Sequence, residues 1–92
     1  MQLNITFRQM ETSDTVKDYV RQKVNKVKKY VPEPVTASVV LSTERFRHLC
    51  DVTIVAEGKT IKGSDSSEET LYSSIDKVMD KIERQLRDRK AR

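Results

Sequence analysis

Apolar and polar residues alternate in three stretches of the chain, and a period of two is typical of strands with one buried face. In the first stretch Leu3, Ile5 and Phe7 alternate with polar residues. Strands are predicted on this basis at residues 2–8, 35–42 and 50–56, and a tight connection at residues 57–59 predicts a short fourth strand at residues 60–64. Residues 43–47 would form the turn between the second and third strands, and the polar residues 65–67 would end the fourth.

Two longer stretches have apolar residues at helical spacing. The first carries valines on one face, at Val16, Val20, Val24, Val27 and Val31. Thr12 or Ser13 can cap this helix, and Pro32 and Pro34 end it, because proline cannot continue a helix. The second helix runs to about residue 90 and has its apolar face at Leu71, Ile75, Val78, Met79, Ile82 and Leu86.

Ser66 and Glu69, which precede the second helix, have the spacing of a capping box. The elements follow the order β-α-β-β-β-α, so we predict an α+β fold in which a four-stranded sheet has two helices packed on one face. The other face would be exposed to water, with Asn4, Thr6, Ser38 and Thr53 on it. At 92 residues the chain is expected to form one domain, residues 1–92.

Few residues are candidates for catalysis or metal binding. The only histidine and the only cysteine, His48 and Cys50, lie near the start of the third strand, where Cys50 should face the core and His48 should be solvated. These two residues are too few for a zinc site. Asp76 and Asp80, four residues apart on the second helix, are interpreted as a solvated acidic stripe. We therefore predict no enzymatic activity, no metal and no cofactor.

A lone cysteine cannot form an intramolecular disulfide and is compatible with a reducing compartment. The chain opens with alternating apolar residues, so no signal peptide is expected. No apolar run approaches the roughly 18 residues that a membrane-spanning helix needs. We expect a cytoplasmic protein that does not bind membranes and is a monomer when free.

Positive charge is concentrated on the two predicted helices. The chain has 18 lysines and arginines against 14 aspartates and glutamates, so its net charge of +4 is small. The positions of the basic residues along the chain are more informative than this total. Residues 14–31 contain six basic and two acidic residues, and residues 84–92 contain five and one. The basic residues of the first helix form two edges, one with Lys17, Arg21 and Lys28 and the other with Lys23, Lys26 and Lys29.

The second helix separates its charges by sign. Its basic flank has Lys77, Lys81 and Arg84, and its acidic flank has Asp76, Asp80 and Glu83. If both helices cover one sheet face, their basic flanks can merge into a surface that follows a phosphate backbone. Cations near a helix C-terminus also favour the helix dipole whatever the function. Tyr19, Tyr30 and Tyr72 border apolar faces, so contact with phosphates and RNA shape is expected instead of base stacking.

The segment 71–86, which reads LYSSIDKVMDKIERQL, resembles the closing helix of the ribosome hibernation promoting factors. Its tyrosine, its Ile-Asp pair and its Lys-x-x-Arg-Gln-Leu pattern carry the resemblance. The opening MQLNIT, with Gln9, Met10 and Glu11 leading into the first helix, is similar to the opening of the same family. The resemblance covers essentially the whole chain, and β-α-β-β-β-α is the order of that family.

This resemblance implies a stationary-phase protein that occupies the decoding region of the small ribosomal subunit, blocks mRNA and tRNA, and inhibits translation. Short members of the family are associated with paired, inactive ribosomes and act beside a ribosome modulation factor. Longer members carry a C-terminal dimerisation domain, and one short paralogue carries an acidic tail. This sequence has neither feature and is similar to the short hibernation promoting form. The implied partners are the small subunit and its rRNA, with the ribosome modulation factor as a further candidate.

The resemblance also selects one edge of the first helix, because its lysines match basic family positions that face rRNA. The expected rRNA-binding residues are Lys23, Lys26, Lys29, Lys77, Lys81, Arg84, Arg87 and Lys90. Two residues depart from the family pattern. Asp88 stands where a lysine is common, at the far end of the basic stripe, and Thr70 stands where an aspartate is common, which concerns helix capping.

Two alternatives stay open. The β-β-β-α half resembles a double-stranded RNA-binding module, but the last helix of that module usually starts with lysines, and here Glu68 and Glu69 occupy the place. A protein-binding module could use the polar face of the sheet, although no residue pattern supports it specifically.

Overall fold

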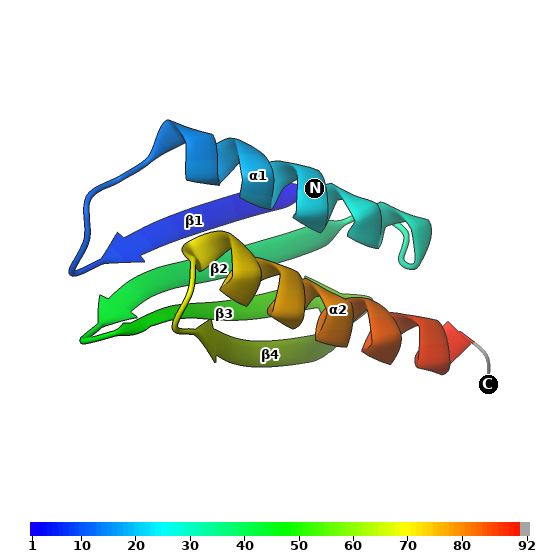
Figure 1. The fold of residues 1–92 in the computed structure, drawn as a ribbon. Helices are drawn as coiled ribbons and strands as arrows, with labels where there is room; N and C mark the ends of the chain where they lie inside the picture. The colour runs from blue at the N-terminus through cyan, green and yellow to red at the C-terminus, as the bar shows by residue number, and fades with distance from the viewer. Residues whose placement is uncertain (91–92) are drawn as a thin grey trace.

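The computed structural model describes the backbone of residues 1–90 and the side chains of residues 1–88. Its elements are β1 (Gln2–Arg8), α1 (Asp14–Asn25), a 3-10 helix η1 (Lys26–Lys29), β2 (Val35–Glu44), β3 (Arg47–Ala56), β4 (Lys59–Ser67) and α2 (Leu71–Lys90). The sheet has the order β1-β2-β3-β4, with β1 parallel to β2 and the other pairs antiparallel. Both helices cover one face of this sheet (Figure 1), which confirms the predicted α+β fold.

The core lies between the two helices and the covered face of the sheet. Val20 of α1 and Ile82 of α2 are fully buried against strand residues such as Leu41 and Ile54. Cys50 is also fully buried, which confirms its prediction as a core residue. Burial, together with the nearby charge of Asp51, raises the pKa of the Cys50 thiol to about 12, so this group stays protonated and unreactive at neutral pH.

The first helix is shorter than its valine pattern predicts. Ser13 is its cap, because the hydroxyl accepts a hydrogen bond from a backbone amide of the first turn at 3.2 Å. The α-helix ends at Asn25 and continues as the 3-10 helix η1, not as α-helix to residue 31. Three residues per turn keep Val27 on the same side as Val24, and both are buried, so the tighter turn preserves the core contact.

The β2–β3 hairpin has a tight turn of two residues, Arg45 and Phe46, instead of the predicted turn over 43–47. Thr43 pairs with His48, so both strands extend almost to the tip. His48 is consequently held in the ladder and half-buried, which corrects the expectation that it is solvated. The turn closes because Arg45 adopts a positive φ of 54°.

The fourth strand continues to Ser67, through the polar residues that were expected to end it. As an edge strand, β4 can place polar side chains in water or beside donors from a helix. The predicted capping box is wrong because Ser66 belongs to the strand, and the Glu69 amide donates instead to the Ser67 hydroxyl at 3.1 Å. Thr70 caps α2 instead, and its hydroxyl accepts from the Ser73 amide at 3.0 Å.

The second face of the sheet is uncovered in the part of the chain that the structure describes. Asn4 and Thr6 of β1 are exposed, and Ser38 and Thr53 on the central strands are half-buried among their neighbours. This confirms the predicted polar face. Val55 is an apolar exception on it, with 42% of its surface exposed.

Candidate nucleic-acid interface

The seam between α1 and α2 is held by polar contacts to one carboxylate. The Tyr19 hydroxyl donates to an oxygen of Asp76 at 2.5 Å, and the Lys23 ammonium lies 3.3 Å from the same oxygen. The ring of Tyr19 also meets the ring of Tyr72 edge-on, with 4.9 Å between centroids. Asp76 was expected to be solvated, but its carboxylate joins the two helices.

These contacts with Asp76 shift the pKa values of Tyr19 and Lys23. The hydrogen bond to Asp76 is the main cause that raises the pKa of Tyr19. Partial burial works to lower the pKa of Lys23, but its hydrogen bond and charge interaction with Asp76 outweigh burial and raise it. Lys23 is therefore a cation at neutral pH whose charge is already balanced within the seam.

We expect Tyr19→Phe to lower the free energy of unfolding by about 1 kcal/mol, because it removes the hydrogen bond to Asp76 and keeps the ring. This loss in the free energy of unfolding is smaller than for a buried hydrogen bond to a charged group, because the Asp76 side chain is 45% exposed and water can replace the hydroxyl. Urea unfolding measures the change. Tyr72→Phe is the matched control, because the Tyr72 hydroxyl has no hydrogen-bond partner among the described residues. Equal stability of both variants would contradict a role for the Tyr19 hydroxyl.

The basic flank of α2 lies over the free edge of β4. Lys77, Lys81 and Gln85, which follow one another at intervals of four, donate to the backbone carbonyls of Ser66, Ser64 and Lys62, each at 3.2 to 3.3 Å. An exposed strand edge is a site for unwanted pairing with another chain, and covering its acceptors protects it. Lys77 and Lys81, which were predicted to contact rRNA, thus have a structural role. The charge analysis missed Gln85, which could have been found because it lies four residues after Lys81.

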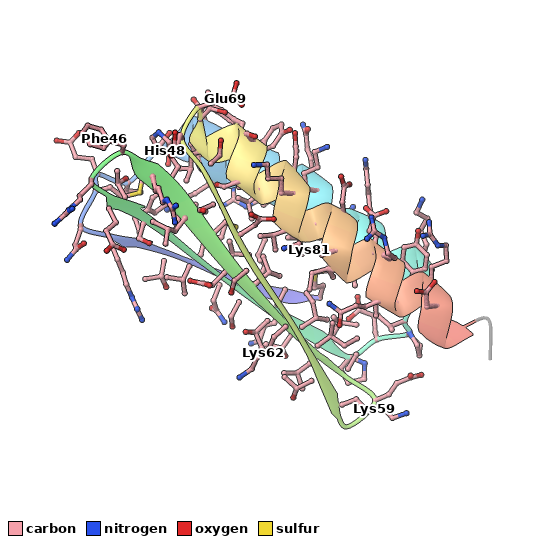
Figure 2. All side chains as sticks on the ribbon, turned by 60° about the horizontal axis from the view of Figure 1, so that its bottom comes forward. Phe46, His48, Lys59, Lys62, Glu69 and Lys81 are labelled. Carbon is pink, nitrogen blue, oxygen red and sulfur yellow. The ribbon has the colours of Figure 1, made fainter. Side chains whose placement is uncertain are left out.

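Lys81 also forms an ion pair with Asp65 on β4, at 3.0 Å (Figure 2 shows Lys81 directed from α2 toward the sheet). The hydrogen bond from Lys81 is the main cause that lowers the pKa of Asp65, and the Ser66 amide adds to it. A phosphate that approached Lys81 would have to compete with this carboxylate. Lys81 is therefore a weaker candidate for RNA contact than its place in the sequence indicates.

The remaining predicted residues are exposed. Lys26 lies on η1, and Arg84 and Arg87 lie on the second half of α2; none of the three side chains has a hydrogen-bond or ion-pair partner among the described residues. Lys29 is exposed as well, with its ammonium 5.7 Å from the ring centroid of Tyr30. We call Lys26, Lys29, Arg84 and Arg87 the helix-end cations. The side chain of Lys90 lies outside the described residues.

The two basic flanks do not merge along the whole length of the helices, as the charge pattern had suggested. Lys23 faces the acidic flank of α2 through Asp76, whereas Lys77 and Lys81 lie on the far side of α2, over β4. The helices run in the same direction, so η1 and the second half of α2 reach the same end of the domain (Figure 1). Positive charge is therefore available mainly at that end.

The fold and the site together define a small basic α+β domain. Its candidate binding surface consists of exposed, positively charged side chains. No group of three or more metal-ligating side chains that could hold a metal occurs in the described part of the chain. Within the same part, no helix combines the length and the apolar character needed to cross a membrane.

The chain belongs to the family described as Sigma 54 modulation protein / S30EA ribosomal protein, whose match covers residues 3–92. The ribosome hibernation promoting factor of Escherichia coli strain K12 is 34% identical over 86 residues, which cover 94% of this chain and 90% of that protein. The ribosome hibernation promotion factor of Lactococcus lactis is 38% identical, and the alignment covers all of this chain and 51% of that longer protein.

Among solved structures, the N-terminal domain of Protein Y from Thermus thermophilus superimposes with a TM-score of 0.87 at 25% identity, covering 94% of this chain and 96% of that one. These findings confirm the resemblance to the ribosome hibernation promoting factors. The family is non-enzymatic, in agreement with the prediction that this chain catalyses no reaction.

Proposed function

We propose that residues 1–92 act as one ribosome-binding domain in the cytoplasm of stationary-phase cells. The domain occupies the decoding region of the small subunit, blocks mRNA and tRNA, and inhibits translation while promoting inactive ribosome dimers, with the ribosome modulation factor as a candidate partner. The relatives that are named ribosome hibernation promoting factors support this assignment. Inhibition is steric and needs no chemistry from the protein.

The observation that carries the proposal is the exposed positive charge of the helix-end cations. The side chains of Lys26, Arg84 and Arg87 have no carboxylate partner among the described residues, so each loses little when it exchanges water for an RNA phosphate, and each contact releases counterions. Arg84 and Arg87 can each bind a phosphate with two parallel hydrogen bonds. Lys23, Lys77 and Lys81 would add to binding at greater cost, because each already has a protein acceptor.

We expect the protein to sediment with purified ribosomes at low salt and to be released as salt rises. If the four helix-end cations each contact one phosphate, the logarithm of affinity should fall with the logarithm of salt with a slope of roughly −3 to −4. Long duplex RNA, added as competitor, should displace little of the bound protein. Failure to sediment at low salt would contradict the proposal, and equal displacement by any duplex would instead favour a general RNA-binding module.

A further inference from the structure

The tip of the β2–β3 hairpin carries an aromatic side chain that no part of the described structure covers. Phe46 is 84% exposed, far more than the other large apolar residues of the surface, Val55 and Tyr72. It occupies the second position of the two-residue turn, so its ring projects beyond the end of the sheet (Figure 2). Exposed aromatic rings are costly in water and are typical of surfaces that bind a partner.

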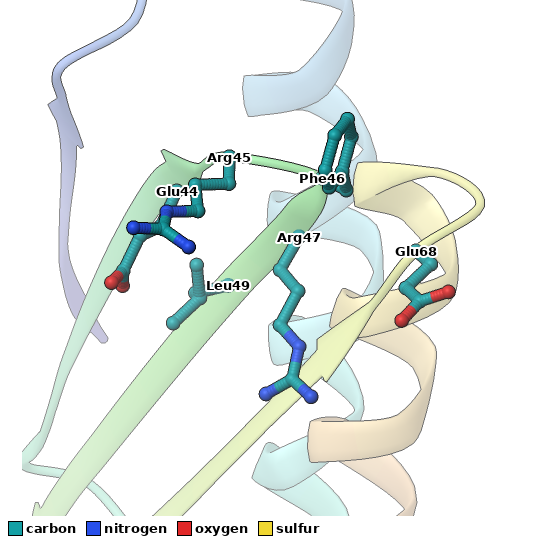
Figure 3. A pocket seen from close by; sticks show the side chains of 6 residues that line it. All are labelled: Glu44, Arg45, Phe46, Arg47, Leu49 and Glu68. Atoms are coloured by element: carbon teal, nitrogen blue, oxygen red, sulfur yellow. The ribbon is translucent and has the colours of Figure 1, made fainter.

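Arginines stand on both sides of this ring in the sequence. Arg45 and Arg47 are exposed, and neither side chain has an ion-pair or hydrogen-bond partner among the residues described. Glu44 and Glu68 help to line a hollow beside the ring, together with both arginines, but no ion pair joins them (Figure 3). The tip thus offers an aromatic face and two guanidinium groups that form no ion pair among the described residues.

The backbone of the tip gives a second observation. Arg45 has a φ of 54°, in the left-handed region where a side chain is strained and glycine is favoured. The hairpin would close more easily with glycine there, and the chain instead carries a cation.

We propose that Phe46 stacks on an unpaired nucleobase of RNA while Arg45 and Arg47 contact the adjacent phosphates. A nucleotide combines a flat base with a negative charge, which matches this tip better than a purely apolar protein pocket would. That the RNA is ribosomal rests on the proposed function. The tip lies at the opposite end of the domain from the helix-end cations (Figure 1), and the longest dimension of the molecule is 40 Å. Contacts at both ends would fix how the domain is oriented along its RNA.

Fluorescence tests the stacking directly, because the chain contains no tryptophan. We expect the emission of a Phe46→Trp variant to be quenched both by a single-stranded RNA dodecamer of mixed sequence and by ribosomes, since a stacked base quenches indole. Phe46→Ala should bind the dodecamer about 5- to 100-fold more weakly. Phe46→Leu should lose as much, because it keeps the apolar surface without the ring. Thermal unfolding should not change in these variants, since the side chain lies outside the core.

The outcomes separate this inference from the proposed function. Sedimentation with ribosomes without quenching, or a blue shift alone, would overturn the inference and leave the ribosome as partner, with the tip in a protein pocket. Wild-type binding by Phe46→Leu would also overturn it. Quenching by the dodecamer without sedimentation would support the stacking and contradict the proposed function.

Arg45→Gly gives an independent measure. The variant should unfold at a temperature a few degrees higher, because the strained φ is relieved, and should bind the dodecamer more weakly because a phosphate contact is lost. Higher stability with unchanged binding would contradict a contact by Arg45. Arg45→Lys keeps the charge and should retain most of the affinity.

Discussion

The double variant Lys26→Glu with Arg84→Glu is expected to lose ribosome binding by about 100-fold or more. Each substitution removes a charge-assisted contact worth about 1.5 kcal/mol or more and replaces it with repulsion from phosphate. Both side chains are exposed and have no partner among the described residues, so the fold should not change. Sedimentation with ribosomes measures the loss, and an unchanged circular dichroism spectrum shows that the variant is folded.

A second charge reversal on the other edge of α1 is the matched control. Lys17→Glu with Arg21→Glu changes the net charge of the protein by the same amount. Arg21 forms an ion pair with Asp18 at 2.8 Å, but this pair is exposed and contributes little to stability. The control should bind nearly as well as the wild type. If it loses as much affinity as the first variant, net charge and not the helix-end cations governs binding, and the assigned surface is wrong.

The order of helices and strands could be predicted from the sequence because the first three strands have a period of two, both helices have a period of about 3.6, and a tight turn at residues 57–59 indicates the fourth strand. The predicted β1 has the observed bounds, Gln2–Arg8. The ends of the other elements depend on pairing between segments, which a period does not contain. The polar residues 65–67 are read as a loop in isolation, yet they pair with β3 and lie beside donors from α2.

The candidate site could be predicted only as a set of cations on two helices. Which of them are available depends on contacts between residues far apart in the sequence. Tyr19 and Asp76, for example, are 57 positions apart. With the apolar face of α2 buried on the sheet, the acidic flank faces Lys23 across the seam, and Lys77 and Lys81 face β4. A helical wheel gives the sign of each flank but not the direction in which the flank faces.

The hairpin tip was missed for a related reason. The sequence places Phe46 within a predicted turn of five residues, and a ring in a loop of that length can fold back onto the protein. The observed turn has two residues, so the ring has no surface of its own hairpin to cover. The sequence does show an aromatic residue between two arginines. Whether its ring is exposed can be judged only once the length of the turn is known.

Gly63→Val is expected to destabilise the fold by about 2 to 3 kcal/mol, although valine favours strands more than glycine does. Gly63 lies on β4 beneath α2, and a Cβ atom there would lie 3.2 Å from the Cδ1 atom of Ile82 and 3.6 Å from the Cγ1 atom of Val78. Valine would add two methyl groups to this tight contact, and the buried Ile82 has little room to move. Urea unfolding measures the loss.

Gly63→Ala is the graded control and should cost less, because a small shift of Ile82 can relieve a contact at 3.2 Å. A Gly63→Val variant as stable as the wild type would show that α2 can move away from β4 without cost. That movement would in turn break the pairing of Lys81 with Asp65 and of Gln85 with the Lys62 carbonyl. The close approach that glycine permits therefore holds the basic flank of α2 in place, and the same residue that stabilises the fold determines which cations are left for RNA.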